Sequence, residues 1–201
     1  MAEHLLAIDC GTQSVRALLF DTSGQLIAKE RVPIEPYYST APGLAEQDPR
    51  VFWDALCTAC QRLLAHENVH AVDIAAASIT TQRATVVNLD KDGKPLRPAI
   101  VWLDQRRTED FKPVGGLWGL AFDLVGVRPT VNYLQAEAEV NWLVKNQPEI
   151  WKDTHKFTYL SGFLVHQLTG KFIDSVGSQV GYMPLDRSEE HTSELQSPNT
   201  I

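Results

Sequence analysis

Residues 9–16 read Asp-Cys-Gly-Thr-Gln-Ser-Val-Arg and connect two short strand-like runs, His4 to Asp9 and Arg16 to Asp21. A glycine in so short a connection lets the chain reverse, so we expect the two runs to pair as a hairpin. The turn would present backbone N–H groups beside the hydroxyls of Thr12 and Ser14, and such a concave set of donors can hold phosphate oxygens. An ordinary hairpin rich in turn residues is the alternative, because Asp-x-Gly-Thr also occurs by chance. The stretch therefore predicts a hairpin and a candidate phosphate site.

The regions that follow the hairpin extend it into an α/β domain. A third strand is expected over residues 25–34, which completes an antiparallel meander. Asp48 and Pro49 predict a helix start, because Asp caps a helix and Pro suits its first position. The helix would bury apolar residues at helical spacing, namely Phe52, Ala55, Leu56, Ala59 and Leu63. The small apolar run 71–80 is expected to follow as a parallel strand buried on both faces.

Weaker patterns in the rest of the chain indicate further short elements. Strands are expected over 85–89 and 98–102, and helices over 117–124, 133–145 and 159–168. The polar stretch that begins at Asp104 is also expected to be helical. Strands and helices in this order predict an α/β domain with a mixed sheet.

The composition excludes several classes of protein. The chain has 201 residues, of which 44% are hydrophobic, and its 25 acidic and 18 basic residues leave a net charge of −7. It is therefore not a disordered chain, and a surface for nucleic acid or an anionic membrane is not expected. We find no signal peptide and no apolar stretch of membrane-spanning length, and three cysteines fit a reducing cytoplasm. Cys57 and Cys60 form a lone Cys-x-x-Cys, which we interpret as two helix residues one turn apart rather than a metal or redox pair.

The turn and four later blocks resemble one family. Asp9, Gly11, Thr12, Ser14 and Arg16 resemble the first phosphate motif of the actin, Hsp70 and sugar-kinase superfamily. Four further blocks resemble the FGGY carbohydrate kinases, the group of glycerol kinase, xylulokinase and ribulokinase: Glu46 to Pro49 with Trp53, Ile79 to Thr85, Arg97 to Arg107 around a Trp-x-Asp-x-Arg core, and Leu168 to Asp174. The resemblance extends from Leu5 to Leu185, with the blocks in order.

This resemblance implies an actin-like ATPase (ribonuclease H-like) domain with a mixed sheet and flanking helices, incomplete in this chain. It implies transfer of the γ-phosphoryl of ATP, with Mg²⁺, to a hydroxyl of a small-molecule sugar or polyol. The cofactor-binding residues would be Asp9, Gly11, Thr12, Gln13, Ser14 and Arg16, with Asp9 serving the metal. The substrate-binding residues would be Gln82, Arg83, Trp102, Asp104 and Tyr133. The catalytic base, an Asp in the family, is expected beyond the chain end.

Each candidate substrate residue also has a structural interpretation. Arg83 could be a solvent-exposed strand end, Trp102 could fill core, and Asp104 could cap a helix. Arg106 and Arg107 are expected on a solvated helix face. Ala84 differs from the glycerol-kinase branch, which has Glu there, and Tyr133 lies one residue out of the usual spacing to Trp142.

The end of the chain has no apolar periodicity. Residues 187–197 are identical to the translation of a common sequencing adapter, so we expect 187–201 to be a non-native tail and 1–186 to be the incomplete domain. Two other functions are kept open: an actin- or Hsp70-like ATPase that shares only the turn, and a non-catalytic fragment. The identity of the sugar and the oligomeric state are not readable from the sequence.

Overall fold

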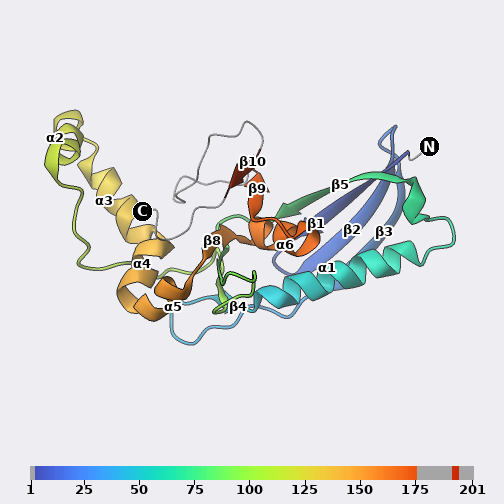
Figure 1. Ribbon diagram of the computed structural model, residues 1–201, viewed down its shortest axis with the longest axis horizontal. Coiled ribbons are helices and arrows are strands. Elements are labelled where there is room, and N and C mark those ends of the chain that lie inside the picture. The colour runs from blue at the N-terminus through green and yellow to red at the C-terminus, as the bar shows by residue number, and fades with distance from the viewer. Residues whose placement is uncertain (1–2, 176–191, 195–201) are drawn as a thin grey trace.

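Three antiparallel strands open the structure, a computed structural model that describes residues 3–175 and 192–194. Strands β1 (His4–Cys10), β2 (Ser14–Asp21) and β3 (Leu26–Pro33) form the expected meander, with β2 in the middle. The register places Asp9 opposite Arg16, and Arg16 opposite Arg31. The meander is drawn in blue in Figure 1. The turn between β1 and β2 is thus attached to a regular sheet on both sides.

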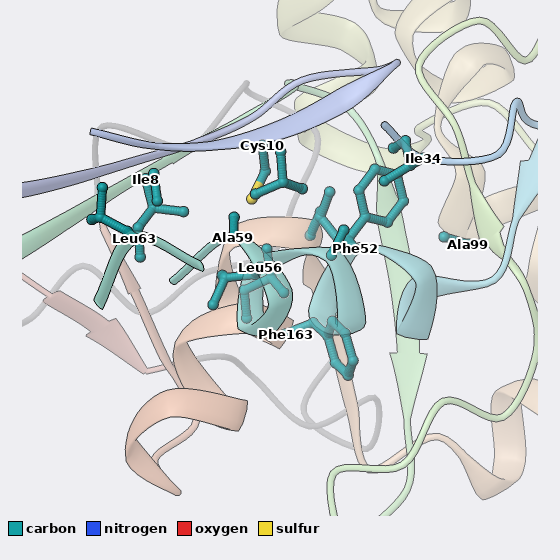
Figure 2. Packing of buried hydrophobic residues seen from close by; sticks show 14 of the residues in the cluster. Ile8, Cys10, Ile34, Phe52, Leu56, Ala59, Leu63, Ala99 and Phe163 are labelled. Carbon is teal, nitrogen blue, oxygen red and sulfur yellow. The ribbon is translucent and has the colours of Figure 1, made fainter. Parts of the chain in front are cut away.

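Helix α1 (Pro49–Leu64) covers one face of this meander and begins as the sequence predicts. The side chain of Asp48 accepts a hydrogen bond from the N–H of Arg50 at 2.9 Å, and Pro49 is the first helical residue. The five predicted apolar positions of α1 are all buried, opposite alternate residues of β2: Val15, Ala17 and Leu19. Figure 2 shows Phe52, Leu56, Ala59 and Leu63 within this cluster. Burying a side chain such as Phe52 stabilises the folded state by about 1.5–3 kcal/mol relative to leaving it exposed. Apolar packing therefore holds α1 on the meander.

Strand β5 (Ile74–Thr81) lies parallel to β1 and completes a sheet of order β3-β2-β1-β5. A short 3₁₀ turn (Ala71–Asp73) precedes it. The expectation of a strand buried on both faces is wrong, because residues 75–78 are exposed. Among the described strands β5 pairs with β1 alone, and α1 packs mainly on β2 and β3. Small apolar side chains suit a sheet edge as well as an interior, so composition did not distinguish the two.

A second, smaller sheet lies beside the first. It consists of β4 (Glu46–Gln47), β7 (Ala99–Ile100), β6 (Val86–Leu89) and β8 (Lys156–Tyr159), in that order. Helix α6 (Leu160–Thr169) follows β8 directly and ends at Gly170, whose φ of +71° only glycine adopts freely. Leu160, Phe163 and Leu164 of α6 are buried in the same core as α1. This shared core joins the two sheets.

Four helices occupy the segment between β7 and β8: α2 (Gly116–Val125), α3 (Arg128–Glu137), α4 (Glu139–Asn146) and α5 (Pro148–Asp153). The single helix expected over 133–145 is wrong, because the chain leaves helical geometry at Ala138. The carbonyl of Gln135 accepts from the side chain of Asn141, and the carbonyl of Ala136 accepts from the N–H of Thr108. A continuous helix would need both carbonyls for its own backbone, so these contacts accompany the break.

The polar stretch after Asp104 is not helical, which is a second correction. Residues 104–115 form an irregular segment, and α2 begins only at Gly116. Backbone groups in this segment bond to distant parts of the chain, as when the N–H of Gln105 donates to the carbonyl of Gly43 at 2.7 Å. Tertiary contacts of this kind override a weak local preference.

Helices α2 and α3 extend away from the two sheets, at the left of Figure 1. Leu117, Trp118 and Leu124 of α2 are largely exposed. None of the helices within the described residues has both the length and the apolar character that crossing a membrane requires.

The expected tail contains one described segment. Strand β10 (Thr192–Glu194) pairs antiparallel with β9 (Ile173–Ser175). Asp174, in β9, is buried and accepts a hydrogen bond from the hydroxyl of Ser161 at 2.6 Å. The rest of 187–201 lies outside the described residues.

Candidate functional site

The turn between β1 and β2 is closed by its own backbone. The N–H of Gly11 donates to the carbonyl of Ser14 at 3.1 Å, and the carbonyl of Gln13 accepts from the N–H of Ile34 at 3.1 Å. Asp9 and Arg16, which face each other across the two strands, form an ion pair of 2.7 Å between partly exposed side chains. The predicted phosphate-binding residues therefore form one compact unit.

Five of these residues, Gly11, Thr12, Gln13, Ser14 and Arg16, line a cavity of about 570 Å³, and Asp9 lies next to it as the ion-pair partner of Arg16. Its other walls come from β3 and the segment after it, and from the loop that follows β7; they comprise Arg31, Ile34, Pro36, Tyr37, Trp102 and Leu103. Arg16 and Arg31 lie side by side in the register, and both line the wall. The cavity is suited to an anionic group, because cations and backbone donors both face such a ligand.

Two predicted substrate residues are joined to the turn by hydrogen bonds. The hydroxyl of Thr12 donates to Gln82 Oε1 at 2.9 Å, and the indole N–H of Trp102 donates to Thr12 Oγ1 at 3.2 Å. Both contacts connect residues at least 70 positions apart. The structure therefore brings one predicted phosphate residue and two predicted substrate residues together.

Arg83 and Ala84 follow β5 and complete this side of the site. Together with Thr12, Gln82 and Trp102 they line an open cavity of about 420 Å³. The guanidinium of Arg83 is exposed and forms no ion pair with any described residue. It is available to bind a ligand that carries hydrogen-bond acceptors.

Asp104 is buried and holds the loop that carries Trp102. Only 3% of its side chain is exposed. One of its carboxylate oxygens accepts from the N–H of Ala45 at 2.6 Å, and the guanidinium of Arg106 binds both oxygens at 2.7 Å. The backbone N–H of Arg106 also donates to this carboxylate at 2.8 Å. Asp104 therefore makes the hydrogen bond of a helix N-cap, but the residues after it form a loop instead of a helix.

The expectation of a solvated Arg106 is wrong. Its side chain is 2% exposed and also pairs with Glu46 at 2.8 Å, as does Arg97. Burial alone would lower the pKa of Arg106, but hydrogen bonds to Asp104 and Glu46 hold it above its ordinary value. Arg107 is exposed as expected, and it pairs with Glu137.

Tyr133 is not brought to the other candidates. It lies on α3, half-exposed, with the guanidinium of Arg107 over its ring at 5.5 Å. It is absent from the walls of the cavities that Trp102 lines.

Sequence reasoning missed a third cavity, of about 140 Å³, which shares Ala84 and Trp102 with the open cavity. It is lined by Ala84, Trp102, Asp104, Arg106, Glu137, Glu139 and Tyr159. Removal from water raises the pKa of Glu139, and the nearby charges of Asp104 and Glu137 raise it further. No local pattern singles out Glu139 or Tyr159, since they reach the site only through the packing of α4 and β8.

Asp9 is the candidate metal ligand of the turn. Among the described residues no group of three or more His, Cys, Asp or Glu side chains could hold an ion, so a preformed protein cage is not found there. Mg²⁺ is commonly held by one or two carboxylates together with substrate phosphates, and a single Asp9 beside a phosphate site fits that arrangement. Cys57 and Cys60 lie one turn apart on α1, as expected from their spacing.

Comparison with known proteins agrees with this geometry. Residues 4–188 match the family described as "FGGY family of carbohydrate kinases, N-terminal domain". The glycerol kinase of Thermococcus gammatolerans is 32% identical over 178 residues, which are 86% of this chain and 36% of that protein. The chain therefore spans about a third of the length of the curated relatives it matches.

Solved structures show the same fold. The xylulose kinase of Rhodospirillum rubrum has a TM-score of 0.65 at 22% identity, over 84% of this chain and 34% of that one. The glycerol kinase of Plasmodium falciparum, solved with ADP, has a TM-score of 0.55 at 26% identity, over 83% and 34%. The fold expected from the resemblance is confirmed, and an actin- or Hsp70-like protein outside the sugar kinases is not favoured. The chain belongs to the FGGY family of carbohydrate kinases, and its residues 4–188 correspond to the N-terminal domain of that family.

Proposed function

We propose that the protein is an ATP-dependent kinase that transfers the γ-phosphoryl group to a hydroxyl of a sugar or polyol. The observation that carries this proposal is the chain of hydrogen bonds from Trp102 through Thr12 to Gln82. It connects the phosphate-type turn to the residues proposed for the acceptor. Phosphoryl transfer depends on holding donor and acceptor in line, so a rigid connection between their sites has a direct use.

In this proposal the turn and its two strands bind the polyphosphate of ATP. Gly11, Thr12, Gln13 and Ser14 supply the turn, and Arg16 supplies positive charge. Asp9 would hold Mg²⁺, which neutralises charge on the phosphate oxygens when it is bound. The ion pair with Arg16 keeps the carboxylate of Asp9 at the turn.

The acceptor is proposed to bind between Thr12 and Ala84. Gln82 and Arg83 would bind its hydroxyls, and the half-exposed ring of Trp102 would pack against its carbon face. Asp104 and Tyr133 remain predicted acceptor residues. The hydrogen bonds of Asp104 suit it to holding the Trp102 loop, and Tyr133 would need a movement of α3 to contact an acceptor.

The catalytic base and the nucleotide-base subsite are proposed to lie outside residues 1–186, with residues 187–201 a non-native tail. The free thiols fit the reducing compartment expected from the sequence, so we propose a cytoplasmic enzyme.

The test is product analysis with the full-length protein. Incubation with ATP, Mg²⁺ and a panel of sugars and polyols is expected to yield ADP and a phosphorylated acceptor in equal amounts. Release of free phosphate without a phosphorylated acceptor would indicate an ATPase instead and contradict the proposal.

A further inference from the structure

The cavity beyond Ala84 adjoins the proposed acceptor site. The two cavities share Ala84 and Trp102 as walls, and the farther one has a volume of about 140 Å³. That is roughly ten times the space a single water molecule requires. Ala84 carries one methyl group, and a larger side chain at this position would project between the two spaces. The farther cavity therefore has room for an additional part of the acceptor.

The backbone at Ala84 is unusual in the same place. Its φ is +53°, in the left-handed region that residues other than glycine seldom adopt. Such strain persists only where the surroundings impose it, and it is concentrated at binding sites. Here it sets the direction of the methyl group at the junction of the two cavities.

Glu139 is the carboxylate in this cavity that lacks a cation. Asp104 is neutralised by Arg106, and Glu137 by Arg107. Glu139, at the start of α4, forms no ion pair with any described residue, although it is partly withdrawn from water. A buried carboxylate is costly unless donors reach it. The carboxylate of Glu139 accepts a hydrogen bond from its own backbone N–H, and the nearby charge of Arg106 favours its ionised form. An ionised carboxylate has lone pairs for further donors, so it can also accept from a ligand in the cavity.

We propose that Glu139 binds the distal hydroxyls of the acceptor and, with Ala84, selects polyols or ketoses longer than three carbons. This inference rests on the proposed function. A hydroxyl suits a wall that carries both Glu139 and Arg106, because it can donate to a carboxylate and accept from a guanidinium, whereas an ammonium group can only donate. The ring of Tyr159, also in the wall, can cover the carbon side of the chain.

The experiment compares Glu139→Gln with wild type in the full-length protein, using glycerol and xylitol as three- and five-carbon acceptors. The substitution keeps the shape of the side chain and removes its charge. The KM for xylitol is expected to rise about 10- to 100-fold, while the KM for glycerol and for ATP changes by less than about twofold. Glu149→Gln, on the exposed surface of α5, is the control for lost charge.

A second variant tests the space itself. Ala84→Asn introduces a residue that tolerates positive φ but fills the junction, so it should weaken the binding of xylitol more than the binding of glycerol. Ala84→Gly, which leaves the junction open, should change the KM for xylitol and the KM for glycerol by the same factor. Equal effects of Glu139→Gln on glycerol and xylitol would show a structural role and overturn the inference, as would no effect on either.

Binding measured by calorimetry separates this inference from the proposed function. If xylitol binds and Glu139→Gln lowers its affinity, but no phosphorylated product forms, the subsite stands and the kinase assignment fails. If xylitol is phosphorylated normally by Glu139→Gln, the kinase assignment stands and the subsite fails. A preference for an amino sugar over xylitol that is lost in the variant would overturn the choice of a hydroxyl.

Discussion

The hydroxyl of Thr12 donates to the side-chain oxygen of Gln82 at 2.9 Å, across 70 positions of sequence. Thr12 belongs to the turn between β1 and β2, and Gln82 directly follows β5, which is parallel to β1. The ends of these two strands meet because β1 and β5 are neighbours in the sheet. The proposed phosphate and acceptor sites therefore share a wall that the sheet itself builds.

Arg83→Ala in the full-length enzyme should raise the KM for the acceptor about 10- to 100-fold, because a charged hydrogen bond to the acceptor is lost. The KM for ATP should change by less than about threefold, since Arg83 does not line the cavity of the turn. Initial rates at varied acceptor and ATP concentrations measure both values. Arg62→Ala, at the exposed end of α1, is the matched control. An unchanged acceptor KM would contradict the assignment.

Asp9→Asn should reduce kcat by about 100-fold or more while the acceptor still binds, because Asp9 is proposed to act at the transferring phosphate. The variant also weakens the ion pair with Arg16, which is partly exposed and contributes little to stability. Coupled measurement of ADP release gives kcat, and calorimetry gives acceptor affinity. A comparable loss of acceptor affinity would point to misfolding of β1 instead.

Arg106→Leu should lower the free energy of unfolding by about 3–5 kcal/mol, because it leaves the carboxylates of Asp104 and Glu46 buried without this partner. Arg107→Leu removes the neighbouring arginine, whose side chain is 58% exposed, and should cost less than about 1 kcal/mol. Urea denaturation of the two variants measures the difference. Similar losses from both would show that the buried cluster is not a stabilising unit.

Cys10 should resist alkylation in the folded protein at about pH 8, whereas Cys57 should react. Burial, followed by the charge of Asp9, raises the pKa of the Cys10 thiol from 9.0 to about 12. Cys57 is only partly buried, although burial raises its pKa as well, so reagent can reach its thiol. Mass spectrometry after timed iodoacetamide treatment identifies the modified residue, with unfolded protein as the control in which both react. Early modification of Cys10 would contradict its position in the core.

The raised pKa of the Cys10 thiol also predicts a dependence of stability on pH. The folded state retains the Cys10 proton more strongly than the unfolded state, so its contribution to the free energy of unfolding is complete below pH 9.0 and is lost as the pH rises toward 12. Cys10→Ala should lessen the fall in stability over this interval. An identical fall in wild type and variant would assign the alkaline loss to other groups.

Local patterns were sufficient for the parts of the fold that depend on neighbouring residues. The meander, the cap at Asp48 and the buried face of α1 all agree with the sequence. The site residues Thr12, Gln82 and Trp102 were also named from the sequence, and the structure brings them together. The features of the fold follow from turn chemistry, capping and periodicity, which are properties of short segments, whereas Gln82 and Trp102 were named from the resemblance to the FGGY family.

The tertiary structure decided the rest, through contacts between segments that are distant in sequence. The helix expected over 133–145 breaks because carbonyls at 135 and 136 are used by other partners, and Arg106 is buried because Glu46 and Asp104 meet it there. β5 is exposed because of its place at the edge of the described sheet. Glu139 reaches Ala84 only through the packing of α4. Partners of this kind alter both burial and hydrogen bonding, and neither quantity is a property of the local sequence.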